Sequence, residues 1–102
     1  SEKRAMAFYL DGRVSALFGT HPHVQTADEC ILNNGTGYIT DLGMVGTIDS
    51  VLGVKPEIVI DKFKYNMPAR FDFIKGPASL CGCIFEVDDK TGKTISVEKI
   101  CI

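Results

Sequence analysis

Apolar residues near the start of the chain are spaced like those of one short helix and one strand. Met6, Tyr9 and Leu10 recur at helical intervals, so they predict a helix over residues 3–10 and form its apolar face. The largely apolar run 14–18 lacks a polar alternation and predicts a buried strand. We therefore expect the chain to begin as a helix followed by a strand.

Residues 30–40 carry the pattern of a hairpin. The segments 30–32 and 37–40 are short and largely apolar, and the sequence Asn-Asn-Gly-Thr at 33–36 favours a tight turn between them. Residues 41–46 follow directly and contain two glycines, which is typical of a loop. We expect a pair of antiparallel strands and then this loop.

A second helix is expected in the middle of the chain. Pro56 is of a type favoured in a first helical turn, and it predicts the start of a helix of about ten residues. Val59, Phe63 and Met67 recur at intervals of four residues, which predicts an apolar stripe along this helix. Pro68 cannot continue a helix, so we expect it to close this one.

The last part of the chain predicts a second hairpin. Residues 71–73 alternate between apolar and polar as a short strand does, and the arms 79–87 and 94–102 flank a polar loop. Ile95 and Val97 alternate with polar neighbours, as on a half-buried strand. The whole pattern indicates a mixed α/β protein with antiparallel hairpins toward its C-terminus.

Composition and charge exclude several classes of function. The chain has 102 residues, of which 45% are apolar and 24% charged, and its formal net charge is −2. This charge, without any run of Lys or Arg, provides no electrostatic footprint for nucleic acid or for a membrane surface. No apolar stretch approaches the ~20 residues that a membrane-spanning helix needs. We therefore expect a cytoplasmic protein with no membrane partner and no nucleic-acid partner.

The four cysteines fit this location. Cys81 and Cys83 are separated by one residue, which is not the spacing of a zinc knuckle, and they share one face of a predicted strand. Nothing in the sequence indicates secretion, so we expect Cys30, Cys81, Cys83 and Cys101 to be reduced thiols that behave as small buried apolar side chains.

The candidate chemistry lies in the only two histidines. His21 and His23 stand in the sequence Gly-Thr-His-Pro-His at 19–23, just past the predicted strand, and Pro22 restricts the backbone between them. Two imidazoles on a rigid loop at the carboxyl end of a strand are typical of metal ligands. The alternative is a capping or hydrogen-bonding role in the turn. Two ligands do not complete a metal site.

Several nearby residues are candidates to assist the histidines. Asp41 ends a predicted strand and could hydrogen-bond an imidazole, while Gly43 and Met44 belong to a loop whose backbone N–H groups could face an anionic substrate. A tight turn that needs a positive φ explains the glycine equally well. We interpret Asp28 and Glu29 as a solvated turn rather than as ligands.

These motifs together carry a resemblance to a known family. The chain resembles the YmdB-like bacterial branch of the calcineurin-like metallophosphoesterases. The resemblance covers nearly the whole chain and is densest over residues 1–53. It is carried by Asp-Gly-Arg-Val-Ser-Ala at 11–16, Gly-Thr-His-Pro-His-Val-Gln-Thr-Ala-Asp-Glu at 19–29, Tyr-Ile-Thr-Asp at 38–41, Gly-Met at 43–44 and Asp-Ser-Val-Leu-Gly at 49–53.

The resemblance implies a fold, an activity and a metal site. Residues 1–102 would be the C-terminal portion of a single metallophosphoesterase domain, a four-layer α/β/β/α sandwich, without its N-terminal half. The activity would be two-metal hydrolysis of cyclic nucleotides such as 2′,3′-cyclic AMP. By resemblance, His21 would bind one metal ion and His23 the other, with iron or manganese as the expected metals and zinc as an alternative.

The remaining ligands and the catalytic acid of the family belong to motifs that precede this segment. The resemblance therefore implies no catalytic residue within residues 1–102, and it makes the missing N-terminal half and a small phosphodiester the expected partners. The alternatives are a stable but catalytically inactive fragment and a small metal-binding or structural module. The sequence leaves the oligomeric state open, a homo-oligomer included.

Overall fold

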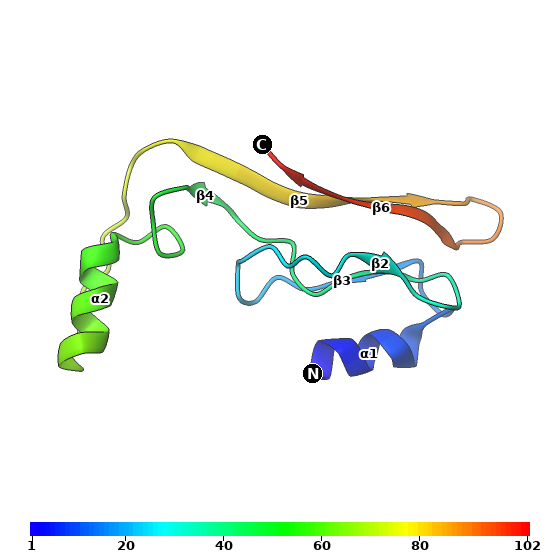
Figure 1. The fold of residues 1–102 in the computed structure, drawn as a ribbon, viewed down its shortest axis with the longest axis horizontal. Helices are drawn as coiled ribbons and strands as arrows, with labels where there is room; N and C mark the ends of the chain where they lie inside the picture. Colours follow the sequence, from blue (N-terminus) through cyan, green and yellow to red (C-terminus); the bar gives the residue numbers. More distant parts are fainter. The chain divides into compact units, whose positions relative to one another are not determined.

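The structure, a computed structural model, describes every residue from 1 to 102 and comprises two compact units. The first unit contains Ser1–Met44 and Cys81–Ile102, and the second contains Val45–Leu80. Figure 1 shows the helices and strands of both units. In chain order they are α1 (Glu2–Leu10), β1 (Ala16–Phe18), β2 (Cys30–Ile31), β3 (Gly37–Ile39), β4 (Val45–Thr47), α2 (Pro56–Tyr65), β5 (Ala78–Val87) and β6 (Thr94–Cys101).

The first unit is built of three layers. Its central layer is a three-stranded sheet in the order β1-β3-β2, in which β3 runs parallel to β1 and antiparallel to β2. The hairpin of β5 and β6 covers one face of this sheet, with β6 against β2 and β3, and α1 lies on the other face (Figure 1). All three residues of β3 are buried, so the core lies around the central strand.

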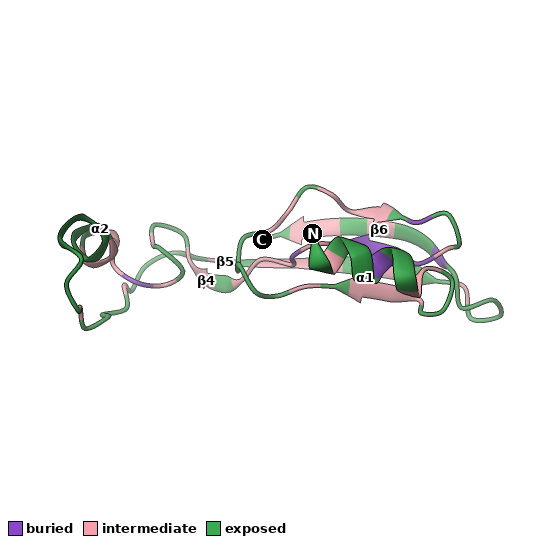
Figure 2. Cartoon of the chain, turned by 90° about the horizontal axis from the view of Figure 1, so that it is seen from below, coloured by how far each residue is buried: buried purple, intermediate pink, exposed green.

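The helix α1 confirms the predicted helix, but its buried face differs from the prediction. Ala7 is fully buried and packs with Leu32 and Tyr38. Most of α1 is exposed, as the green of this helix in Figure 2 shows. Met6 and Tyr9 are exposed, and Tyr9 retains 71% of its accessible surface. A small residue lets the helix approach the sheet closely, which a stripe of large apolar side chains would prevent.

The predicted buried strand at 14–18 is shorter and more exposed than expected. It forms β1 over Ala16–Phe18 only, and Phe18 is 53% exposed although its ring stacks on that of Phe85 at 6.2 Å between centroids. The reason is position, because β1 is an edge strand of its sheet and has a neighbour on one side only.

Both predicted hairpins are confirmed. In the first, β2 and β3 join through a turn in which Leu32 N–H donates to the Thr36 carbonyl at 2.8 Å, and Gly35 adopts a φ of 99°. In the second, β5 and β6 pair in a register that is irregular only between Glu86 and Val87. The prediction that Ile95 lies on a buried face is wrong, because this side chain is exposed.

The prediction of a loop over residues 41–46 is wrong at its end. The last residues of this segment belong to β4, which pairs antiparallel with Ala78–Leu80, the first residues of β5. The expected strand at 71–73 is also wrong, since only Phe73 forms a bridge, with Val54. The strand β4 arises from pairing with a distant segment, which local sequence patterns do not reveal.

The helix α2 (Pro56–Tyr65, ten residues) confirms the predicted start and length, but not the closure by Pro68 or the predicted apolar face. It ends at Tyr65, because Asn66 adopts the left-handed conformation with a φ of 51°, before Pro68 is reached. None of its residues is buried, and Phe63 of the expected apolar stripe is 80% exposed. Neither α1 nor α2 is long and apolar enough to cross a membrane.

Candidate functional site

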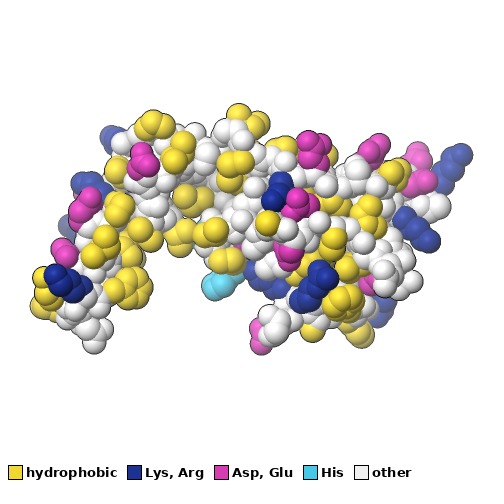
Figure 3. Space-filling view, in the orientation of Figure 1, with side chains coloured by type: hydrophobic (Ala, Val, Ile, Leu, Met, Phe, Trp, Pro, Cys, Tyr) yellow, Lys and Arg dark blue, Asp and Glu magenta, His cyan; other side chains and the backbone are white.

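The two histidines lie on the loop that leaves β1. Both side chains are exposed, and histidine atoms (cyan) are visible at the surface in Figure 3. His23 has a φ of 60°, a left-handed conformation that few non-glycine residues adopt. The loop therefore presents both imidazoles to solvent, where they can accept an external ligand or metal ion.

The first half of this loop is held by a close backbone approach at Gly19. The Gly19 carbonyl accepts a hydrogen bond from Leu42 N–H at 2.9 Å. A Cβ atom at Gly19 would collide with the Thr40 carbonyl oxygen and would lie 2.7 Å from Lys3 Nζ. Only glycine allows the chain to pass at this distance, so Gly19 anchors the loop against the segment that follows β3.

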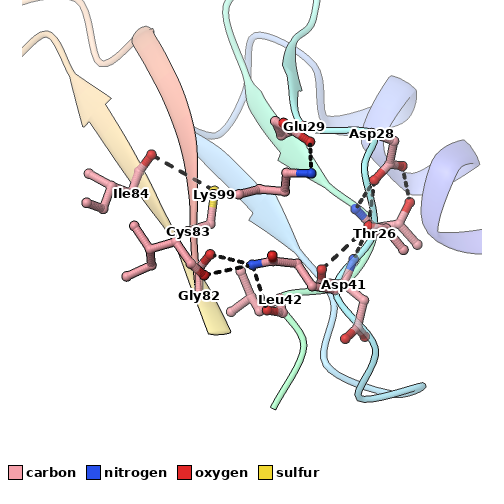
Figure 4. A network of polar contacts seen from close by, with 12 residues as sticks. Thr26, Asp28, Glu29, Asp41, Leu42, Gly82, Cys83, Ile84 and Lys99 are labelled. Carbon is pink, nitrogen blue, oxygen red and sulfur yellow. Dashed lines mark hydrogen bonds and ion pairs between the residues drawn. The ribbon is translucent and has the colours of Figure 1, made fainter. Parts of the chain in front are cut away.

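The second half of the loop is held by one side-chain amide. Gln25 Nε2 shares its two N–H groups among three backbone carbonyls, those of Gly82 at 2.8 Å, Ile100 at 3.1 Å and Leu42 at 3.3 Å. Gly82 and Leu42 are labelled in Figure 4. These acceptors belong to β5, to β6 and to the segment after β3. Gln25, two residues beyond His23, thus ties the loop to three separate segments of the first unit.

Hydrogen bonds to Asp28 hold the next part of the loop (Figure 4). Its carboxylate accepts hydrogen bonds from Thr26 Oγ1 at 2.6 Å, from Thr40 N–H at 3.1 Å and from the Thr40 hydroxyl. Partial burial raises the pKa of Asp28, but these hydrogen bonds outweigh it and hold the pKa below its ordinary value of 3.8.

The interpretation of Asp28 and Glu29 as a solvated turn is therefore wrong. Asp28 is half-buried and joins the histidine loop to the end of β3. Glu29 is also half-buried and pairs with Lys99 of β6 at 3.4 Å between Oε2 and Nζ. Sequence reasoning missed both contacts, because Thr40 and Lys99 lie far along the chain.

Asp41 is fully buried beside the loop. Its Oδ1 accepts a hydrogen bond from Gly43 N–H at 2.9 Å, and its Oδ2 lies 3.5 Å from Lys3 Nζ of α1. Both oxygens thus face groups other than an imidazole. A contact between Asp41 and a histidine stays a prediction.

Gly43 and Met44 dock against the start of the C-terminal hairpin. Gly43 has a φ of 85°, and a Cβ there would lie 2.8 Å from Cys81 Cβ and 3.0 Å from Gln25 Cβ. The Met44 carbonyl accepts a hydrogen bond from Cys81 N–H at 3.1 Å. The tight turn thus accounts for the glycine, and a role of these two residues in binding substrate stays a prediction.

Residues 1–102 do not by themselves provide a complete metal site. No group of three or more His, Cys, Asp or Glu side chains is placed to hold a metal ion. His21 and His23 fit as two ligands, since both are exposed nitrogen donors on a loop that Gly19 and Gln25 hold at its two ends. Further ligands would have to come from outside this segment.

Comparison with known proteins identifies the family. The family model described as "YmdB-like protein" matches residues 1–100. The chain belongs to this family. Its relatives include the 2′,3′-cyclic-nucleotide 2′-phosphodiesterase of Bacillus subtilis, which is 50% identical over 102 residues. That match includes the whole of this chain but 39% of the relative, so the chain spans about two fifths of its length.

Two crystal structures share the fold. One, described as a novel phosphatase from Mycoplasma pneumoniae, superposes with a TM-score of 0.93 at 44% identity and matches 99% of this chain and 36% of that one. The other, a hypothetical protein from Thermus thermophilus, has a TM-score of 0.92 at 37% identity and matches 99% of this chain and 39% of that one. The arrangement of helices and strands in this chain is thus shared with part of each of these two proteins.

Substitution of Gln25 tests its role as the anchor of the histidine loop. Gln25→Met should destabilise the protein by about 1–3 kcal/mol, because three carbonyls lose their donor. Gln25→Glu should be worse at neutral pH, where a carboxylate would face carbonyl oxygens, and should recover toward a pH of about 4 as the carboxyl group becomes protonated and donates. In the folded protein the neighbouring carbonyl oxygens would raise the pKa of the introduced carboxyl group. The stability of this variant should therefore fall as pH rises through that pKa.

Urea denaturation of the complete protein at acidic and neutral pH measures both effects. Val24→Ala is the matched control, because Val24 is exposed in the same loop and should change the midpoint little. A Gln25→Met midpoint equal to that of Val24→Ala would show that the amide contributes nothing.

Proposed function

We propose that the protein that contains this chain is a metal-dependent phosphodiesterase that hydrolyses cyclic nucleotides of the 2′,3′-cyclic AMP kind. The observation that carries this proposal is the 50% identity, over every residue of the chain, to the Bacillus subtilis 2′,3′-cyclic-nucleotide 2′-phosphodiesterase. The description of the Mycoplasma pneumoniae structure as a phosphatase supports the same class of reaction. We infer that the substrate is a small phosphodiester.

His21 and His23 would hold the metals, one ion each of a pair, with iron or manganese as the expected metals. The proposal is supported by the exposure of both imidazoles and by the contacts of Gly19 and Gln25 that hold their loop. When bound, such ions polarise phosphoryl oxygens and activate water. The role of this chain is to hold the two imidazoles in place, and neither histidine acts as the acid or base.

We further propose that residues 1–102 are the C-terminal portion of one four-layer α/β/β/α domain. The order of layers in the first unit supports this, because α1, the sheet of β1, β2 and β3, and the hairpin of β5 and β6 stack in turn. Sheets and helices bury their apolar faces against further layers. The remaining ligands and the outer layer would then come from the N-terminal half.

Two measurements test this function. The complete protein should hydrolyse 2′,3′-cyclic AMP and bis-p-nitrophenyl phosphate, should lose this activity when a chelator removes its metal, and should regain it with manganese or iron. Residues 1–102 alone should show no turnover with the same metals, because two imidazoles do not hold two ions.

The outcomes separate the alternatives. Full activity of the complete protein after exhaustive removal of metal would contradict the metal-dependent reading. Turnover by residues 1–102 alone, retained after repurification, would contradict the division of the site between two parts of the protein. Inactivity of the complete protein toward every phosphodiester would favour a binding or structural role.

A further inference from the structure

Two cysteines face each other where the C-terminal hairpin opens. Cys81 of β5 and Cys101 of β6 are direct cross-strand partners, and their Sγ atoms lie 2.9 Å apart. Cys101 is exposed and Cys81 is half-buried. The two thiols are therefore close to each other, and one of them is open to reagents in solution.

The position of this pair in the ladder allows the small movement that a disulfide needs. Side chains directly opposite each other on antiparallel strands have Cβ atoms about 4.5–5.5 Å apart, whereas a disulfide requires about 3.5–4.5 Å. Cys81 and Cys101 form the pair of the β5–β6 register farthest from the connecting loop. Cys101 is the last residue of β6, and a strand end can shift more easily than the middle of a ladder, so β6 can close this gap here.

The other two cysteines occupy different surroundings. Cys83 is opposite Lys99 on β6, and burial together with nearby Glu29 raises the pKa of its thiol, which makes it a slower nucleophile. Cys30 lies on β2, where its Sγ accepts a hydrogen bond from Arg4 Nη1 at 3.8 Å. The geometry therefore selects one pair among the four cysteines.

We propose that Cys81 and Cys101 are a site of reversible oxidation to a cross-strand disulfide by low-molecular-weight disulfides. The exposed Cys101 thiolate attacks one sulfur of the small disulfide, forms a mixed disulfide and releases one small thiol. The Cys81 thiolate then attacks Cys101 Sγ and releases the second small thiol. The protein loses two hydrogen atoms, and the small disulfide is reduced to two thiols.

The disulfide would reinforce a contact beside the histidine loop. Cys81 N–H donates to the Met44 carbonyl. Cys81 Cβ is the atom nearest to the position that a Cβ at Gly43 would occupy. A link between Cys81 and Cys101 would oppose fraying of the end of β6 away from Cys81, the residue on which Gly43 and Met44 dock. This inference stands on the hairpin alone and does not depend on the proposed phosphodiesterase activity.

The experiment uses the complete protein, reduced and then incubated under native conditions with glutathione disulfide. After free thiols are alkylated, peptide mass mapping should find Cys81 and Cys101 linked in one chain, with the loss of two hydrogen atoms, and Cys30 and Cys83 alkylated. Dithiothreitol should restore alkylation of both linked cysteines. In the fully reduced protein all four cysteines of the segment should be alkylated.

Matched variants assign the effect to this pair. Cys81→Ser and Cys101→Ser should each abolish the internal link and leave glutathione on the remaining partner or no modification, whereas Cys30→Ser should leave the link unchanged. The proposal is overturned if Cys81 and Cys101 of the unsubstituted protein remain alkylated at the end of the incubation. It is equally overturned if the disulfide joins another pair or two separate chains.

Discussion

Replacement of either histidine, His21→Ala or His23→Ala, should remove most of the phosphodiesterase activity of the complete protein and lower its metal content. Each change removes one nitrogen donor from the loop, so a metal ion held as proposed would lose a ligand. Loss of groups that merely orient a ligand lowers metal affinity or activity about 10- to 100-fold, so loss of the ligand itself should have at least this effect. Metal per chain and hydrolysis rate, measured on the same preparation, check the result.

The fold should survive both changes, because both side chains are exposed and contribute little to the core. The left-handed φ of His23 adds one complication, since alanine is disfavoured there. His23→Asn keeps a residue that tolerates this conformation, so it separates backbone strain from loss of the imidazole. Val24→Ala is the control in the same loop and should keep both metal and activity.

Normal metal content and near-normal rates in both alanine variants would show that the histidines are structural. The metal-binding reading of this loop would then be wrong. A loss of activity in His23→Ala but not in His23→Asn would assign the effect to the backbone rather than to coordination.

The Gly19→Ala variant should be the most destabilising single change in the loop. The added methyl group would collide with the Thr40 carbonyl oxygen, which belongs to the backbone next to the buried central strand β3 and cannot move easily. Lys3 Nζ could swing away, but the carbonyl could not. Such overpacking destabilises by about 1–3 kcal/mol or more. We expect a lower denaturation midpoint together with displaced histidines and weaker metal binding.

Gly76→Ala is the matched control for this change. A Cβ at Gly76 would meet no atom within 4 Å, so this variant should keep the midpoint and the metal content. If Gly19→Ala were as stable as Gly76→Ala and kept its metal, the close approach at Gly19 would not matter for the loop.

Turns and helix starts could be predicted from the sequence, because their conformation depends on adjacent residues. The turn at 33–36 forms because Gly35 adopts a positive φ, and α2 begins at Pro56 because proline fits a first helical turn. The pairing of the two histidines on one loop follows from their adjacency alone. The motifs between residues 11 and 53 together also indicate the family.

Faces and partners could not be predicted in the same way. Spacing along α1 favoured Met6 and Tyr9 as the buried face, yet the sheet contacts Ala7. The strand β4 went unpredicted because its partner, the start of β5, lies beyond the intervening helix. Burial depends on the surface that an element meets, and an amphipathic pattern shows only which surfaces are available.

The sequence by itself determined the hairpins, the helix starts, the pair of histidines on one loop and the membership in the YmdB-like family. Only the tertiary structure decided what holds the histidine loop, since Gln25 reaches acceptors 57 and 75 residues away. The same is true of the contact between Cys81 and Cys101, which are 20 residues apart. Local patterns reflect the conformation of neighbouring residues, whereas a hydrogen bond or thiol contact between distant segments exists only once the sheets have packed.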